Sequence, residues 1–498
     1  MSSETDQPAR PVGLGTHSAR GVTYLFASTA VAKVISFGAQ FILAYLLSEE
    51  DFGVVALAYT ITTFVQVIEQ AGVGDVLVQR KKFRTWVIPA FWLASCMGLV
   101  SSFVTAAAAP IAAHYYKNPQ LFWILLVLAP ASIPNAFMAI PRAQMSRELR
   151  FRTLAIVNLA QLTMRMVLTV LFAWLGFGAF SFVLPVPISN AATAAFLWWW
   201  IRPPFSFSPQ LKKWRYLIGD STRILIAELQ RAFIDQSDNI MLGLFRTVRE
   251  VGLYAFGFNF SIQILQLLAF NLMNVLFPAL TKLNSQPQAQ YQGFIKAQRI
   301  LGAVGISSCL LQTAVAAPLT YLLLEPRWIP SIGVMQILSA GMALRMASGS
   351  SYALLKSQGR FRAILWNRWG IVALQVIGLW TVLRLGGTID AVAAVVALVS
   401  TLIGPITFYT AILPYGVGWR VVAEVLYKPI ATGVISIGTA WLISLKMEEH
   451  GFGPFWQLVE ITIVGVSLNL LIARFWMRSV WDDLWIRVWR LLPSRGHA

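Results

Sequence analysis

Residues 220–245 read DSTRILIAELQRAFIDQSDNIMLGLF, an apolar stretch of membrane-spanning length that carries charged residues. Four of these charges follow one another at steps of three, four and three residues: Glu228, Arg231, Asp235 and Asp238. At about 100° of rotation per residue they share one face of a helix. Charges inside a bilayer are costly unless they face protein or water, so they are rare and usually functional. The stretch therefore predicts a membrane helix whose charged face lines a hydrated cleft.

The composition places this helix in a polytopic membrane protein. Of 498 residues, 57% are hydrophobic and only 12% are charged, more apolar surface than a soluble core can use. The formal net charge is +18, which could indicate nucleic acid but is also the result of basic loops on the cytoplasmic side of a membrane. The loop charges favour the second interpretation, so we expect no nucleic-acid partner.

Signals of metal, disulfide or enzyme chemistry are missing from the sequence. The two cysteines, Cys96 and Cys309, lie in apolar runs, and the four histidines lie in expected tails or loops. The GVGD at 72–75 lacks the strand, helix and Lys-Ser/Thr of a phosphate loop, and neither H-E-x-x-H nor G-x-S-x-G occurs. We expect no cofactor, no metal and no enzymatic activity.

Apolar runs long enough to span a bilayer recur about fourteen times. The expected spans are 21–47, 52–74, 86–113, 119–141, 153–176, 178–201, 218–245, 251–277, 296–324, 330–355, 362–384, 388–413, 424–445 and 455–477. Residues 1–20 form a polar tail before an uncleaved first span.

The charges of the loops orient these spans. Lys and Arg cluster in alternate segments, at 80–84, 142–152, 202–215, 282–299, 356–362 and 420–428. The loops between them hold few basic residues and most of the loop acids, which are Glu49, Glu50, Asp51, Glu250, Glu325, Glu448 and Glu449. The positive-inside rule therefore places both termini in the cytoplasm.

Three basic, tryptophan-containing or amphipathic segments are expected to lie on the inner leaflet and to contact membrane lipids. They are residues 142–152, residues 206–217 and the C-terminal tail 479–498, in which Trp481, Trp485 and Trp489 form a stripe.

The chain also repeats itself weakly. Residues 41–59 can be laid over residues 240–258, which places Gly53 on Gly252 at the same hairpin, six spans apart. This predicts an all-α protein with two parallel six-helix bundles, 21–201 and 218–414, joined by a linker at 202–217, with two additional helices within 424–478.

Polar stripes on several spans predict where the bundles face a common cleft. The candidate substrate-binding residues are Lys33, Arg165, Arg231, Arg345, Gln66, Asn259 and Gln263. Candidates for ion coupling or structural pairing are Glu69, Glu228, Asp235 and Asp238. Arg binds phosphate bidentately and Lys as a point charge, whereas the acids could hold those cations or accept H⁺ or Na⁺. The alternative, that these groups only hold helices together, stays open.

Several motifs resemble the polysaccharide-transport branch of the MOP flippase superfamily. They are AYLLSEEDFGVVALA at 44–58, AGVGDVLVQRK at 71–81, PRAQMSRELRFRTLA at 141–155, LFRTVREVGLYAFGFN at 244–259 and NVLFPALTKL at 274–283. The resemblance implies two six-helix bundles plus two helices, in the inner membrane of a bacterium. It further implies transfer of undecaprenyl-diphosphate-linked oligosaccharide units to the periplasmic leaflet for exopolysaccharide, capsule or O-antigen, as in exporters of the xanthan or colanic acid type.

The same resemblance implies a cationic cavity for the diphosphate, lined by the spans of Lys33 and Arg231, and polymerase and chain-length proteins as partners. Two other functions fit the residues. The acids Glu228, Asp235 and Asp238 would also suit a cation-coupled multidrug-type antiporter, and a membrane scaffold for glycan assembly would need none of the cavity charges.

Overall fold

The computed structural model describes residues 14–70, 77, 83–148, 150–478 and 482, and these residues form a bundle of long helices. The N-terminal half contains α1 (Leu14–Leu46), α2 (Glu49–Gln70), α4 (Phe83–Tyr115), α5 (Pro119–Leu128), the 3₁₀ turn η1 (Ala129–Ala131), α6 (Ser132–Arg147), α7 (Phe151–Trp174), α8 (Phe180–Val183) and α9 (Pro185–Ile201). The prediction of an all-α membrane protein is confirmed.

The C-terminal half begins with α10 (Leu211–Phe245), a helix of 35 residues. It continues with α11 (Val248–Ser261), α12 (Gln263–Leu265), the π-helical η2 (Gln266–Phe270), α13 (Asn271–Lys282), α14 (Pro287–Leu323), η3 (Pro326–Trp328), α15 (Ser331–Ser357), α16 (Phe361–Arg384), α17 (Ile389–Ile412) and η4 (Leu413–Tyr415). The last helices, α18 (Trp419–Glu449) and α19 (Pro454–Trp476), pack against each other and against α14.

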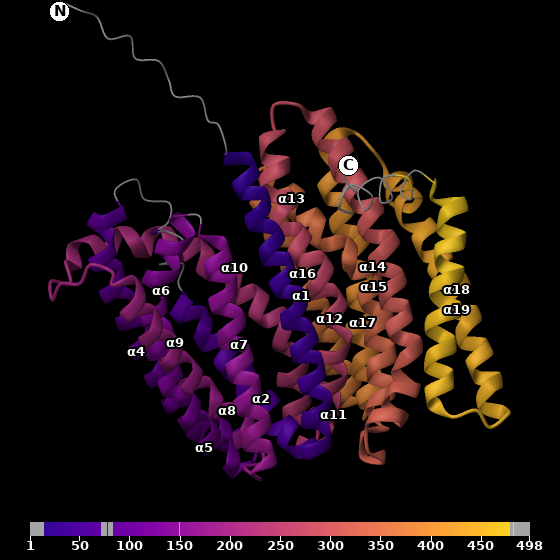
Figure 1. Cartoon of the computed structure of the whole chain (residues 1–498), viewed down its shortest axis with the longest axis horizontal. Helices are drawn as coiled ribbons and strands as arrows, with labels where there is room; N and C mark the ends of the chain where they lie inside the picture. The colour runs from indigo at the N-terminus through magenta and orange to yellow at the C-terminus, as the bar shows by residue number, and fades with distance from the viewer. Residues whose placement is uncertain (1–13, 71–76, 78–82, 149, 479–481, 483–498) are drawn as a thin grey trace, which may run out of the picture.

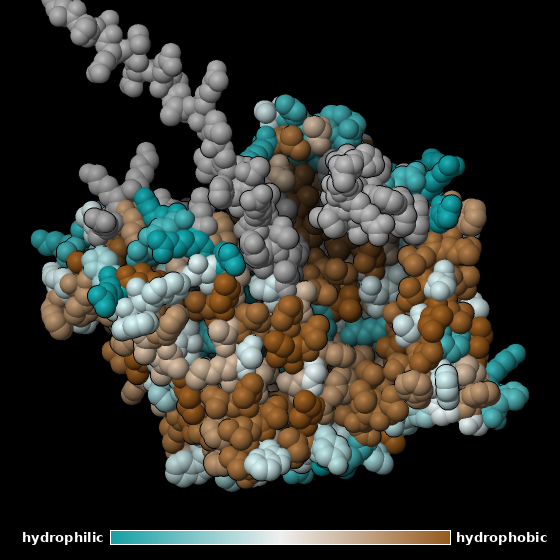
Figure 2. Space-filling view, in the orientation of Figure 1, coloured by the Kyte–Doolittle hydropathy of each residue, from teal (hydrophilic) through white to brown (hydrophobic). Residues whose placement is uncertain are grey.

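Eleven segments of the described chain are long and apolar enough to cross a membrane. The other three expected spans correspond to α2, α10 and α15, which are helices of sufficient length. The expected number of about fourteen spans therefore stays a prediction. Figure 2 shows hydrophobic residues over the flank of the bundle and hydrophilic residues at its two ends.

Two segments expected to lie separately on the membrane surface are parts of longer helices. Residues 142–147 complete α6, and residues 211–217 form the first turns of α10. The helix α14 likewise begins at Pro287, well before the expected 296, because polar turns that continue a helix beyond the bilayer leave no mark in hydropathy. The tryptophan stripe at 481–489, the GVGD at 72–75 and the motif at 71–81 lie wholly or mostly outside the described residues.

The two halves share one hydrophobic core at one end of the bundle. This core includes Leu43 of α1, Phe52 of α2, Phe256 of α11, Trp328 of η3 and Leu383 near the end of α16. We call this the joined end. At the opposite end, the divided end, separate clusters form around Val87 and Met138 in the N-terminal half, the first joined by Leu217 of α10, and around Phe294 in the C-terminal half. In Figure 1 the halves accordingly diverge toward the end at which α1 begins.

Two glycines allow the halves to meet at the joined end. A Cβ added to Gly53 of α2 would lie 1.9 Å from the carbonyl oxygen of Val248, and one added to Gly252 of α11 would lie 1.8 Å from that of Glu49. Each glycine thus faces the backbone of the residue four positions before the other glycine. Only a residue without a side chain permits such close backbone approach. The reciprocal contact supports the predicted repeat, which remains a prediction.

Candidate functional site

A cavity of about 320 Å³ lies between the halves, with α1, α2 and α7 on one side and α11 and α12 on the other. Its polar lining residues are Ser36, Gln40, Tyr59, Arg165, Thr169, Asn259 and Gln263. The cavity therefore brings together three of the seven candidate substrate-binding residues, Arg165, Asn259 and Gln263. It contains no carboxylate among its lining residues.

Lys33 reaches the edge of this cavity from α1. Its Nζ donates a hydrogen bond to Oε1 of Gln263 at 3.0 Å and another to Oε1 of Gln266. Both glutamines belong to the C-terminal half. The hydrogen bonds of Lys33 therefore connect the two halves, and their acceptors are uncharged. Gln263 is itself held by a bond from its Nε2 to the carbonyl oxygen of Asn259 at 2.9 Å.

The cavity cations are not neutralised by acids. In the described part of the chain, neither Lys33 nor Arg165 forms an ion pair. Both are only half-buried, and an Arg165 guanidinium offers several N–H donors in a planar fork. The two glutamine amide oxygens accept hydrogen bonds from the Lys33 ammonium but are uncharged, so they do not cancel its positive charge. The arrangement is suited to an anion with several oxygens, such as a diphosphate.

Arg231 and Arg345 do not line this cavity. The Nε of Arg231 lies 2.8 Å from Oε2 of Glu228 in the preceding turn, and its side chain is 58% exposed. The Nη2 of Arg345 on α15 lies 3.6 Å from Oδ1 of Asp235 on α10, and the arginine side chain is only 16% exposed. These two pairs place the charges of α10 against each other or against α15.

Asp238 lies apart from the other charges of α10. It is 1% exposed, and its Oδ2 accepts a hydrogen bond from the hydroxyl of Tyr254 on α11 at 2.7 Å. Its Oδ1 accepts the backbone N–H of Asn239 at 2.9 Å. The charged face expected from residues 220–245 is therefore divided, because its last member turns into the contact between α10 and α11.

The two remaining candidates lie on α2. Glu69 is buried, and its Oε1 accepts a hydrogen bond from Nδ2 of Asn135 on α6 at 2.6 Å. Gln66, in contrast, is exposed. Neither residue lines the central cavity, and the Glu69 bond ties helices within the N-terminal half.

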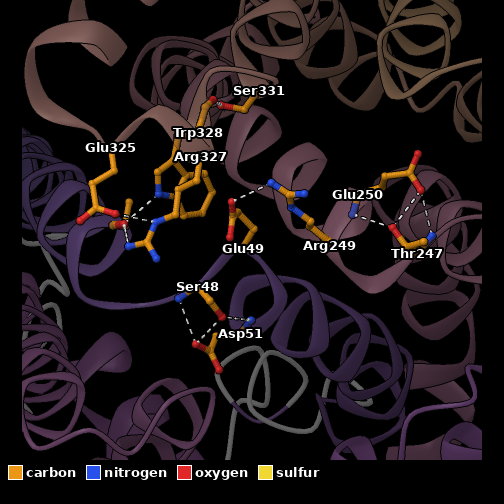
Figure 3. A network of polar contacts seen from close by, with 11 residues as sticks. Ser48, Glu49, Asp51, Thr247, Arg249, Glu250, Glu325, Arg327, Trp328 and Ser331 are labelled. Carbon is orange, nitrogen blue, oxygen red and sulfur yellow. Dashed lines mark hydrogen bonds and ion pairs between the residues drawn. The ribbon is translucent and has the colours of Figure 1, made fainter.

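The joined end carries a polar network that the sequence interpretation missed (Figure 3). The Nη2 of Arg249, in the first turn of α11, lies 3.4 Å from Oε1 of Glu49 on α2. Trp328 is fully buried and donates its indole N–H to the carbonyl oxygen of Ala44 at 2.8 Å. Arg327 donates to the carbonyl oxygen of Tyr45 at 3.0 Å. These contacts cross between halves and close the bundle at this end.

Matching caps begin the two helices of this network. Ser48 and Asp51 exchange two hydrogen bonds at the start of α2. The Asp51 N–H donates to the Ser48 hydroxyl at 3.1 Å, and the Ser48 N–H donates to Oδ2 of Asp51 at 3.0 Å. Thr247 and Glu250 form the same capping box before α11. A Ser/Thr followed by an acid three residues later at both hairpins was the sequence signal for this region.

Comparison with known proteins relates this chain to proteins of polysaccharide biosynthesis and transport. A model of a family described as "Polysaccharide biosynthesis protein" matches residues 42–333. The "Succinoglycan biosynthesis transport protein ExoT" of Rhizobium meliloti (strain 1021) is 24% identical over 471 residues, which cover 92% of this chain and 87% of that protein. The "Lipopolysaccharide biosynthesis protein WzxC" of Escherichia coli (strain K12) is 22% identical over 67% of this chain and 69% of its own length.

Solved structures share the fold at low sequence identity. "Lipid II flippase MurJ, inward closed conformation" superposes with a TM-score of 0.74 at 12% identity, covering 92% of this chain and 99% of that one. An inward-facing multidrug resistance MATE family transporter of the MOP superfamily gives a TM-score of 0.60 at 13% identity, over 79% of this chain and 96% of that one.

Proposed function

Because the chain belongs to the family of polysaccharide biosynthesis proteins, we propose that it moves undecaprenyl-diphosphate-linked oligosaccharide units across the inner membrane by alternating access. The products would serve the assembly of an exopolysaccharide, capsule or O-antigen. The observation that carries the proposal is the central cavity, in which Arg165 and the neighbouring Lys33 carry charges that no acid among the described residues neutralises. The transport and lipopolysaccharide roles named for the relatives from Rhizobium meliloti and Escherichia coli support the same reading.

In this proposal the diphosphate binds at Lys33 and Arg165. A phosphate oxygen takes the place of an amide oxygen at the Lys33 ammonium, and the Arg165 guanidinium binds a second oxygen. Asn259 and Gln263 supply hydrogen-bonding groups for the sugar hydroxyls. The cavity volume, about 320 Å³, is small for a drug-sized ligand, so it takes the diphosphate end while the sugars extend toward the divided end.

The proposed orientation places the divided end in the cytoplasm. Basic residues such as Arg147, Arg202 and Lys356 lie at that end, whereas Glu49 and Glu325 lie at the joined end. This distribution follows the positive-inside rule, with both termini cytoplasmic. The described conformation would then be closed toward the periplasm. Polymerase and chain-length proteins of an export system would act on the product.

A leaflet-resolved transport assay in vesicles tests the function directly. Purified protein is reconstituted with a fluorescent prenyl-diphosphate oligosaccharide, and the fraction moved between leaflets is measured by quenching. We expect the Lys33→Ala/Arg165→Ala variant to lose transport, and a matched Arg420→Ala/Lys428→Ala variant at the exposed start of α18 to retain it. Full transport by the cavity variant at normal abundance would refute the assigned site, and a scaffold predicts that same result.

The alternative function is a cation-coupled antiporter. The observation that favours it is the similarity to multidrug resistance transporters, together with acids on α10. Vesicles without lipid-linked sugar distinguish the two, because drug-dependent H⁺ or Na⁺ flux is expected only from the antiporter.

A further inference from the structure

A second cavity lies at the divided end of the N-terminal half, away from the central one. It has a volume of about 780 Å³ and lies between the start of α4, the end of α6 and the residues that follow α9. Phe83 and Thr85 of α4 line one wall, Gln144 and Arg147 of α6 another, and Arg202 a third. The proposed diphosphate site does not use these residues.

The cavity is electropositive. Arg147 and Arg202 line it, and Lys213 lies beside it, donating to the carbonyl oxygen of Thr85 at 3.3 Å. Glu148 is the acid among the lining residues, and it already lies 2.8 Å from Nε of Arg150. The local balance therefore leaves a surplus of positive charge for an anion.

Aromatic rings and the backbone hold these cations in place. The Arg147 guanidinium lies 5.1 Å from the centroid of the Phe83 ring, and the Lys213 ammonium lies 5.6 Å from that of Trp86. Arg202 has a left-handed backbone with φ of 48° at the end of α9, and its Nε donates to the carbonyl oxygen of Trp199 at 3.3 Å. Cations held in this way lose little side-chain freedom when an anion binds.

Exposed aromatic residues on the segments that carry Arg202 and Lys213 indicate the source of the anion. Phe207 is 83% exposed, Trp199 69% and Tyr216 65%. The linker that carries Phe207 is fixed by a hydrogen bond from the Trp92 indole to the carbonyl oxygen of Ser206 at 2.9 Å. Tryptophan and tyrosine beside basic residues are typical of the membrane interface, where headgroups meet acyl chains. In Figure 2 hydrophilic residues gather at this end above the hydrophobic flank.

We propose that this cavity binds the phosphate headgroup of an anionic phospholipid, with the acyl chains lying along the exposed side chains of Phe207, Trp199 and Tyr216. Basic cavities between helices at the cytoplasmic face suit such headgroups. A free phosphate would use the cations but not the exposed aromatic residues. Because Arg202 begins the connection from α9 to α10, the lipid would brace the linker between the two halves.

The test measures lipid binding by the purified full-length protein in detergent. Phosphatidylglycerol or phosphatidylcholine is titrated, and bound lipid is counted by native mass spectrometry beside the Tm. We expect wild type to bind phosphatidylglycerol preferentially and to gain Tm with it. In the Arg147→Gln/Arg202→Gln variant the affinity should fall at least about tenfold, because two charge-assisted contacts are lost. The matched Arg420→Gln/Lys428→Gln variant removes two exposed charges elsewhere and should behave as wild type.

Three outcomes would overturn the proposal: equal phosphatidylglycerol binding by the cavity variant, equal binding of both lipids by wild type, or the same gain in Tm with inorganic phosphate alone. If the glutamine variant folds poorly, Arg147→Lys/Arg202→Lys is the second variant. It keeps both charges and should still prefer phosphatidylglycerol, so loss of this preference in the folded lysine variant would also count against the site. Since the readout is binding, the transport variant Lys33→Ala/Arg165→Ala should retain it, which separates this inference from the proposed function.

Discussion

Lys33 of α1 donates a hydrogen bond to Gln263 of α12 across the space between the two halves, at 3.0 Å. The bond joins a charged donor to a neutral acceptor, so it satisfies the ammonium without removing the positive charge of the cavity. A substrate phosphate can replace the amide oxygen, and its bond to the ammonium is stronger because the acceptor is then charged as well.

This relationship predicts unequal effects for its two partners. Lys33→Gln removes the charge and is expected to weaken binding of a prenyl-diphosphate lipid by about tenfold or more, since hydrogen bonds to charged groups contribute about 1.5–3 kcal/mol. Gln263→Ala leaves the charge in place and should change binding by less than about threefold. Titration of each purified variant with the lipid measures both. Equal losses in the two variants would contradict this prediction, because the amide would then contribute as much to binding as the charge.

The glycine pair at the joined end gives a second prediction. In Gly53→Ala the new methyl group would meet the carbonyl oxygen of Val248, so α2 and α11 must separate. Overpacking of this kind costs about 1–3 kcal/mol, and we expect a lower Tm and increased solvent access at the joined end. Gly252→Ala should behave alike, because the contact is reciprocal.

Gly38 on α1 is the matched control for that experiment. No heavy atom lies within 4 Å of a Cβ added there, and alanine favours a helix by up to about 1 kcal/mol over glycine. Gly38→Ala should leave the Tm unchanged or raise it slightly. A Gly53→Ala protein as stable as the Gly38→Ala protein would show that the close crossing is unimportant.

Hydropathy predicted the helical membrane fold because it is a local property of the chain. The expected 362–384 and 388–413 agree closely with α16 and α17, whose ends coincide with turns. Helices that continue beyond the bilayer, such as α14, were predicted too short, because their outer turns are polar and resemble loops.

The candidate site was predictable only in part, for a related reason. Periodicity identifies residues on one helix face, so Asn259 and Gln263 were grouped together, and both line the central cavity. It does not determine which helix that face meets. Residues 220–245 could not reveal that Asp238 would turn toward Tyr254 on the next helix while Asp235 turned toward Arg345 on α15.

Asp238 provides a test between structural pairing and ion coupling. Its carboxylate is fully engaged by Tyr254 and the Asn239 N–H, which favours a structural role. Asp238→Asn keeps an acceptor oxygen and should retain transport, with a modest loss of stability. Tyr254→Phe leaves a buried acceptor without its donor and should cost about 1–3 kcal/mol in unfolding free energy.

Transport and thermal unfolding of both variants decide between the two roles. If folded Asp238→Asn protein loses transport at every pH while Tyr254→Phe retains it, the proton on Asp238 takes part in coupling. Glu69→Gln, which also keeps its bond to Asn135, is the comparison for a buried acid within one half.

The pair formed by Arg345 and Asp235 allows the same distinction for a cation. Asp235→Asn leaves the Arg345 guanidinium, 16% exposed, without its partner and should lower the Tm. If the arginine serves only this pair, the double variant Asp235→Asn/Arg345→Gln should recover part of that loss, giving a coupling energy of at least about 0.5 kcal/mol. It should also transport normally. If Arg345 instead binds the diphosphate in another conformation, the double variant will be stable but will bind the lipid poorly. Lipid binding measured beside Tm in the four proteins of this cycle therefore assigns Arg345 to structure or to substrate.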